Sequence, residues 1–198
     1  MSVSLRRSRL VALAAAATFS GAAAVPAAAA TSTAVPVTGV QTAVAPDAGL
    51  VAGLTSLGTT VRLTGAATAD PAGRFVFPVT GGSLTPELKG KVNHTGGIEF
   101  HPKGRLKFGI RTFVIDTRGT TPQLTAEPTL GGLGLGIRVP VADIDGLGVA
   151  SAPPATVVSG TLKLTDIGAL YINTLLGKSA VKRGTVFGQA EATVTLGS

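Results

Sequence analysis

The two histidines of the chain, His94 and His101, stand seven residues apart in the segment KVNHTGGIEFHPKG, with Glu99 between them. Imidazole and carboxylate groups bind zinc, and imidazole exchanges protons near neutral pH. If Gly96 and Gly97 form a two-residue hairpin loop, which glycine favours through its access to positive φ, His94 faces Glu99 across the hairpin. Strand alternation then places all three polar side chains on one face.

Two interpretations of this face are open. The first is a ligand-binding site of His94, Glu99 and His101, either for a metal ion or as a pH-sensitive patch. The second is a solvent-exposed cross-strand pair of His94 and Glu99, which adds only a few tenths of a kcal/mol. The sequence favours the second, because structural zinc normally has four ligands and the segment supplies no fourth. We therefore assign no metal site.

Catalytic groups are hard to find in this sequence. The chain has no cysteine and no Gly-x-Ser-x-Gly motif, so neither a thiolate nor a serine on a nucleophile elbow is available. Asp143 and Asp145 have the spacing of a carboxylate pair for glycoside chemistry, but they lead into an Asp-Gly turn, which explains them more simply. The sequence predicts that the protein is not an enzyme, and we assign no catalytic residue.

Six cations lie between residues 89 and 111, against Glu99 as the one acid: Lys89, Lys91, Lys103, Arg105, Lys107 and Arg111. On one sheet face they would attract teichoic acid, phospholipid or nucleic acid. As solvent-facing side chains they would instead discourage pairing between strand edges, which is the interpretation we favour. We expect no specific nucleic-acid partner.

The N-terminal residues 1–30 have the pattern of a secretory signal peptide. Arg6, Arg7 and Arg9 precede an apolar run, and three alanines end the segment at Ala30. We expect a secreted protein, extracellular or associated with the cell wall, with no transmembrane segment. Residues 31–46 are rich in alanine, threonine and valine and contain two prolines, which indicates a flexible N-terminal arm, or an arm that adds to a sheet edge.

Residues 47–198 are expected to form a single all-β domain, an antiparallel β-sandwich or related barrel with two short peripheral helices. Helical spacing of apolar residues, with an aspartate at the start and a glycine at the end, predicts helices over 47–58 and 166–177. The remaining segments are short, apolar and separated by turn residues. The predicted strands are 60–69, 74–80, 89–95, 98–101, 105–115, 122–127, 135–141, 156–164 and 185–196.

Several motifs in this order resemble a family of uncharacterised secreted proteins of high-GC Gram-positive bacteria. They are FPVTGG (77–82), LKGKVNHTGGIEF (88–100), FVID (113–116) and QLTAE (123–127). More distantly, the layout is similar to HtaA-type haem-uptake domains. That resemblance implies a β-sandwich with a few short helices and a haem pocket, in which a tyrosine on an early helix binds the iron and a histidine near a strand turn assists.

This chain departs from the HtaA pattern at the tyrosine. Residues 48–57 contain no tyrosine, and the only one in the chain, Tyr171, falls on the second predicted helix, while His94 matches the histidine. We therefore expect a secreted, non-catalytic binding or cell-envelope-associated protein without a cofactor, whose partner is an extracellular or cell-wall macromolecule. The alternative is a haem-binding protein of HtaA type, with Tyr171 added to the candidate ligand-binding residues.

Overall fold

The computed structural model describes residues 33–152 and 155–197, so the predicted signal peptide lies outside the described residues. Within them the chain forms one antiparallel sheet and two helices. In chain order the elements are β1 (Val35–Pro46), α1 (Ala48–Ser56), β2 (Thr60–Thr64), β3 (Thr68–Ala69), β4 (Phe75–Leu84), β5 (Gly90–His94), β6 (Gly97–His101), β7 (Phe108–Asp116), β8 (Gln123–Leu130), β9 (Leu133–Gly134), β10 (Val139–Ala152), β11 (Ala155–Leu164), α2 (Asp166–Leu176) and β12 (Val186–Leu196).

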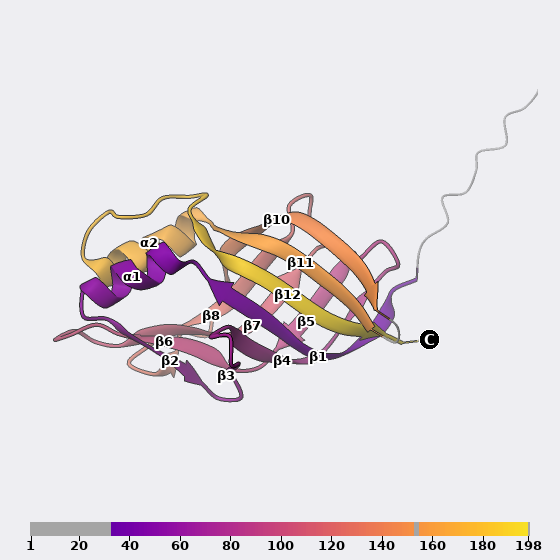
Figure 1. Cartoon of the computed structure of the whole chain (residues 1–198), viewed down its shortest axis with the longest axis horizontal. Helices are drawn as coiled ribbons and strands as arrows, with labels where there is room; N and C mark the ends of the chain where they lie inside the picture. Colours follow the sequence, from indigo (N-terminus) through magenta and orange to yellow (C-terminus); the bar gives the residue numbers. More distant parts are fainter. Residues whose placement is uncertain (1–32, 153–154, 198) are drawn as a thin grey trace, which may run out of the picture. The chain divides into compact units, whose positions relative to one another are not determined.

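Eight of the described strands close into an antiparallel barrel. The ring runs β7-β5-β4-β1-β12-β11-β10-β8, and β8 pairs again with β7 to complete it. Strands β2 and β6 extend the sheet beyond the ring from β7, and β9 extends it from β8. Of the sandwich and the related barrel that the sequence predicted, the structure has the barrel, with the two short helices at one end (Figure 1).

Both helices begin and end close to the positions that their capping residues indicate. The carboxylate of Asp47 accepts a hydrogen bond from the backbone of Leu50 at the start of α1. In α2 the cap is Thr165, whose hydroxyl accepts from the backbone N–H of Gly168, and Asp166 is the first helical residue. Gly177 ends α2 in the left-handed conformation, with φ of 64°.

The segment expected to be a flexible arm is instead a strand in the barrel wall. Residues 35–46 form β1, which pairs with β4 on one side and with β12 on the other. The prediction of a linker was wrong for these residues. The alternative of an arm added to a sheet edge was also incomplete, because β1 has neighbours on both edges and the ring cannot close without it.

The barrel interior is filled by side chains. One buried cluster runs from α1 and α2 through the barrel and includes Leu54, Phe77, Phe113, Leu162 and Ile172. The three small cavities between these side chains measure about 20, 30 and 40 Å³. Each has room for a water molecule or two and no more. A ligand larger than that must bind outside the barrel.

The Gly96-Gly97 pair is a bend between two strands that pair with the same edge of β7, not a hairpin loop. Strands β5 and β6 do not pair with each other: both run antiparallel to β7, at Asn93–Val114 and at Gly97–Arg111. The one-residue offset between these registers is a bulge, closed by a hydrogen bond of 3.0 Å from the Thr112 N–H to the Gly96 carbonyl. The hairpin prediction was therefore wrong.

Substituting Gly96 is expected to be costly for two reasons. Its φ is +90°, and a Cβ there would lie 2.6 Å from the backbone nitrogen of Ala67. We expect Gly96→Val to lower the free energy of unfolding by more than about 1 kcal/mol, measured by denaturant titration. Gly73→Val is the control, because Gly73 has φ of +77° but open space around it. Equal losses for the two variants would show that the close approach to Ala67 is unimportant.

Candidate functional site

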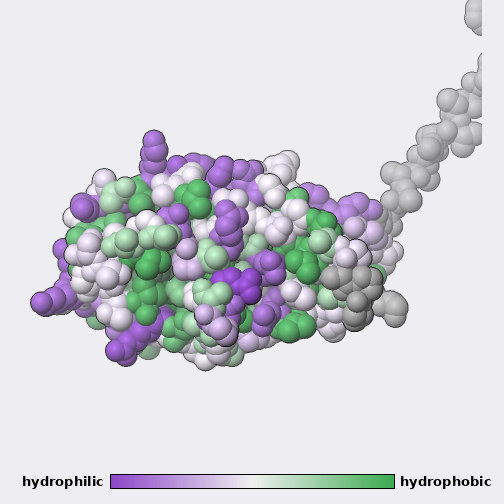
Figure 2. Space-filling model, in the orientation of Figure 1, coloured by the Kyte–Doolittle hydropathy of each residue, from purple (hydrophilic) through white to green (hydrophobic). Residues whose placement is uncertain are grey.

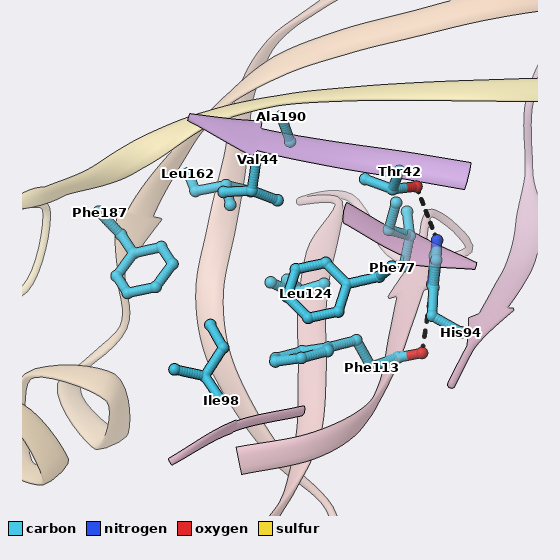
Figure 3. Close-up of a pocket in the computed structure, with 11 residues that line it drawn as sticks. Thr42, Val44, Phe77, His94, Ile98, Phe113, Leu124, Leu162, Phe187 and Ala190 are labelled. Carbon is cyan, nitrogen blue, oxygen red and sulfur yellow. Dashed lines mark hydrogen bonds between the residues drawn. The ribbon is translucent and has the colours of Figure 1, made fainter. Parts of the chain in front are cut away.

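His94 points into the barrel, away from the solvent. Its side chain is only 5% exposed, with Nε2 2.7 Å from the Thr42 hydroxyl and Nδ1 3.3 Å from the Phe113 carbonyl (Figure 3). A carbonyl only accepts hydrogen bonds, so Nδ1 carries the proton and Nε2 accepts from Thr42. Burial lowers the pKa of His94 to about 4, so this imidazole is neutral and structural at neutral pH.

Glu99 and His101 do come together, but without His94. The Nε2 atom of His101 lies 3.1 Å from a Glu99 carboxylate oxygen, and Lys107 Nζ donates to the same carboxylate at 3.1 and 3.2 Å. Burial pushes the Glu99 pKa up, but the hydrogen bonds from Lys107 and His101 outweigh it and the pKa is lowered. The predicted cross-strand pair of His94 and Glu99 does not form, and no three metal-ligating side chains gather anywhere in residues 33–152 and 155–197.

The other carboxylates considered in the sequence are also engaged by cations. Asp143 accepts from Gln123 and Arg183, and Asp145 accepts from Lys163. Each carboxylate is therefore held by a cation, Asp143 by Arg183 and Asp145 by Lys163.

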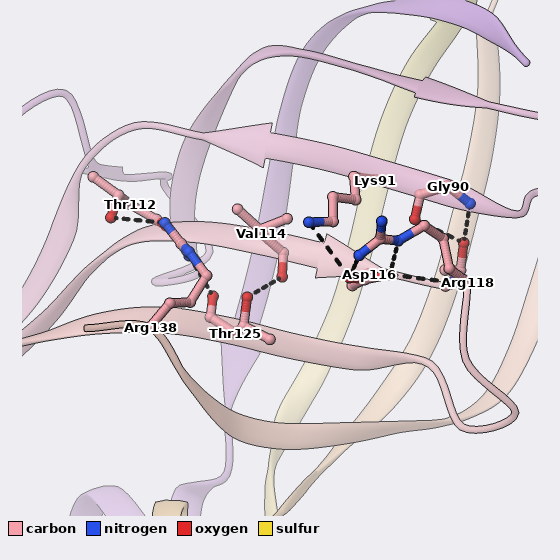
Figure 4. Close-up of polar contacts among 9 residues, drawn as sticks. Gly90, Lys91, Thr112, Val114, Asp116, Arg118, Thr125 and Arg138 are labelled. Carbon is pink, nitrogen blue, oxygen red and sulfur yellow. Dashed lines mark hydrogen bonds and ion pairs between the residues drawn. The ribbon is translucent and has the colours of Figure 1, made fainter. Parts of the chain in front are cut away.

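A second group of charges lies at the C-terminal end of β7. Asp116 accepts from Arg118 and pairs with Lys91 at 3.7 Å, and these contacts lower its pKa to about 2 (Figure 4). Arg138 donates to the Thr112 carbonyl at 2.7 Å, beside the bulge opposite Gly96. Of the six cations between residues 89 and 111, Lys91, Lys107 and Arg111 pair with carboxylates, so the six do not form a single free basic patch.

Among the candidate residues, Tyr171 is the one whose polar group is not engaged by another described residue. It lies on α2, is partly buried, and its ring centroid is 6.5 Å from that of Phe108 on β7. Burial raises the pKa of its phenol. No described residue forms a hydrogen bond with that hydroxyl. The helix is held in position by Thr165, whose hydroxyl donates to the Pro140 carbonyl at 2.7 Å.

A partly exposed apolar strip continues from Tyr171 across the sheet. Phe108 pairs with Leu130, and Leu130 pairs with Leu133, so these side chains share one face of the sheet. Leu130 is 49% exposed, and Leu170, next to Tyr171 on α2, is 63% exposed. We call Phe108, Leu130, Leu170 and Tyr171 the helix-end strip.

Two cations lie at the ends of the helices. The guanidinium of Arg105 packs against Gly177, where an added Cβ would meet its nitrogens at 2.6 and 2.7 Å. Lys103 packs against Gly58, just after α1. Cations are favourable at helix C-termini because the carbonyls there carry partial negative charge. Figure 2 shows hydrophilic side chains projecting from this end of the molecule. The strip is therefore bordered by positive charge.

The described fold resembles several solved structures from Corynebacterium glutamicum. No protein-family model and no curated protein matches the chain. Solved structures do match. The C-terminal domain of HtaA from Corynebacterium glutamicum is 18% identical, with 83% of this chain and 99% of that chain covered and a TM-score of 0.64. The haem-binding protein HtaB from the same organism is 14% identical, with 83% and 96% covered and a TM-score of 0.59.

The chain shares its fold with these domains. The N-terminal domain of HtaA gives the same result, with 18% identity, 81% and 99% covered and a TM-score of 0.59. The predicted distant likeness to HtaA-type domains is confirmed at the level of the fold, although the early helix α1 has no tyrosine. No helix in the described part of the chain is long and apolar enough to cross a bilayer.

The sequence indicated Tyr171 as a candidate but did not indicate the residues around it. Phe108 and Leu130 were inside or next to predicted strands, and nothing local indicated that the two would meet under α2. The signal that was available is the GGLGLG run at 131–136. There Gly132 lies against Lys107 and Glu99, while Gly134 leaves no room for a side chain beside Arg111 and Glu127. The glycines face these ion pairs, so the leucines face the other way.

Proposed function

We propose that this protein is a non-catalytic haem-binding protein, and that the ligand binds at the helix end of the barrel, at the helix-end strip. The observation that carries this proposal is the phenol of Tyr171, which is partly buried beside Phe108 and has no hydrogen-bond partner among the described residues. The shared fold with HtaB, a haem-binding protein, supports the same ligand class. The barrel interior is too full to accept it.

The residues present could hold haem through a tyrosine, as the HtaA pattern implies, but without help from His94. A phenolate is an established iron ligand in haem proteins, and Tyr171 is the phenol that this chain offers. Apolar side chains of the strip would contact the macrocycle, and Arg105 and Lys103 would pair with its carboxylates. His94 cannot assist from within the barrel, because both ring nitrogens are engaged there. Bound haem would supply the iron that the phenolate holds.

The test is a haemin titration followed by the Soret absorption band. We expect the wild-type protein to shift this band, and Tyr171→Phe to weaken binding by at least on the order of tenfold, because only the iron-binding oxygen is removed. His101→Ala is the matched control: it removes the half-exposed imidazole that pairs with Glu99 and should leave the Soret shift unchanged. Unchanged binding by Tyr171→Phe, or loss of binding by His101→Ala alone, would contradict the assignment of Tyr171.

We also propose that the protein acts outside the cytoplasm. The basis is the pattern of residues 1–30, with three arginines before an apolar run and a small-residue end. Detection of the protein in culture medium or cell-wall fractions, with residues 1–30 removed, is the expected result. Retention of the full-length chain in the cytosol would contradict it.

A further inference from the structure

Two loops at the helix end form one continuous surface. Residues 102–107 connect β6 to β7, and residues 130–137 contain the β8–β9 turn. The backbone N–H of Gly131 donates to the Lys107 carbonyl at 2.8 Å, and an added Cβ on Gly131 would lie 3.6 Å from Leu106. We call these two segments the leucine tips.

The leucine tips present aliphatic side chains to solvent. Leu106 is 61% exposed, Leu133 76%, Leu135 47% and Ile137 54%. Gly134, between Leu133 and Leu135, faces an ion pair: a side chain there would overlap Arg111 and Glu127. Leu133, the other residue of β9, therefore points to the opposite face. No packing within the described fold requires leucine at these positions, and clustered exposed aliphatic residues indicate an interaction surface.

The charge of the tips is of one sign. Residues 102–107 and 130–137 contain Lys103, Arg105 and Lys107 and no aspartate or glutamate. Lys107 pairs with Glu99, which leaves two other cations. Lys103 and Arg105 are exposed and make no ion pair with the described carboxylates. Their charge is available to an anionic partner.

We propose that the leucine tips dock on a lipid bilayer with anionic headgroups. Exposed leucines would enter the interface between headgroups and acyl chains, while Lys103 and Arg105 would contact the headgroups. Protein-binding surfaces are enriched in aromatic residues and methionine, and the tips contain none of these. The tips share Leu130, Lys103 and Arg105 with the proposed haem site but do not include Tyr171, so the proposal goes beyond haem binding and is tested without the iron ligand.

Vesicle co-sedimentation tests the proposal. The full chain is mixed with vesicles of phosphatidylcholine alone, or of equal parts phosphatidylcholine and phosphatidylglycerol. We expect binding to the anionic vesicles, and on the order of tenfold weaker binding for Leu133→Ser/Leu135→Ser. Lys103→Gln/Arg105→Gln should lose on the order of thirtyfold on anionic vesicles, since each cation near such a surface adds about 1 kcal/mol. Residues 1–30 are the same in every variant, so differences between variants report on the tips.

Val40→Ser/Val149→Ser is the matched control, because these side chains are 66% and 58% exposed but lie outside the tips. It should sediment like the wild type. Equal binding by all three double variants, or no preference of the wild type for anionic vesicles, would overturn the proposal and leave the tips as a site for a protein partner. Tyr171→Phe should bind vesicles normally, so a failure of haem binding and a failure of membrane docking give different results.

Discussion

Lowering the pH from 7 towards 4 is expected to destabilise the barrel by about 3 kcal/mol through the buried imidazole of His94. The pKa of His94 is lowered to about 4 in the folded protein by burial, against about 6.5 in the unfolded chain. Below pH 6.5 the imidazole of His94 therefore binds a proton in the unfolded state but stays neutral in the folded state. Stability falls through this window as the pH is lowered, and the loss is complete once the folded pKa is passed.

Urea denaturation between pH 7 and pH 4.5 measures this effect separately from the carboxylates. The pKa values of Asp116 and Glu99 are lowered by their cationic partners, so the stability that these groups add is lost mainly below this range. His94→Gln should flatten the pH dependence, because it removes the titrating group. A flat wild-type profile would show that His94 is not held neutral.

The helices could be predicted from the sequence because their signals are local. Asp47 caps α1 and Gly177 ends α2, each within a few residues of the bonds it makes. The strands were mostly placed for the same reason, since turn residues separate them. What local signals cannot give is the partner of each strand, because that choice depends on residues far along the chain.

Strand β1 and the bend at Gly96 show this limit. Residues 35–46 are small and have no marked alternation, so they resemble a linker until β4 and β12 supply neighbours on both edges. Two consecutive glycines favour a hairpin, but β7 accepts β5 and β6 along the same edge and converts the pair into a bulge. This one change of partner turned His94 inward and separated it from Glu99.

The candidate site was predictable in its chemistry but not in its position. Tyr171 was identifiable as the only phenol in the chain. The position of Tyr171 beside Phe108 requires α2 to lie over β7. That position depends on how the first turn of α2 packs against β10. The close packing at this turn involves Gly168, which the sequence does not distinguish from other helical glycines.

Gly168→Ala is expected to destabilise the protein by about 3 kcal/mol or more, although alanine is the better helix former. An added Cβ at Gly168 would overlap the backbone carbonyl of Val141 and lie 3.3 Å from Leu164. A backbone atom of the barrel wall cannot move aside as a flexible side chain can. Removing this overlap therefore requires α2 to shift. The shift would weaken the contacts of Thr165 with β10 and displace Tyr171, which lies one helical turn after Gly168.

Gly53→Ala is the matched control for this substitution. Gly53 lies inside α1 with no other atom within 4 Å of an added Cβ. Replacing it should raise the free energy of unfolding by roughly 0.5–1 kcal/mol, because alanine loses less backbone entropy on folding. The two variants make the same chemical change with opposite expected signs, so the comparison isolates the contact with β10. If both variants were stabilised, α2 would be free to move from β10 without loss, and the position of Tyr171 would not depend on this packing.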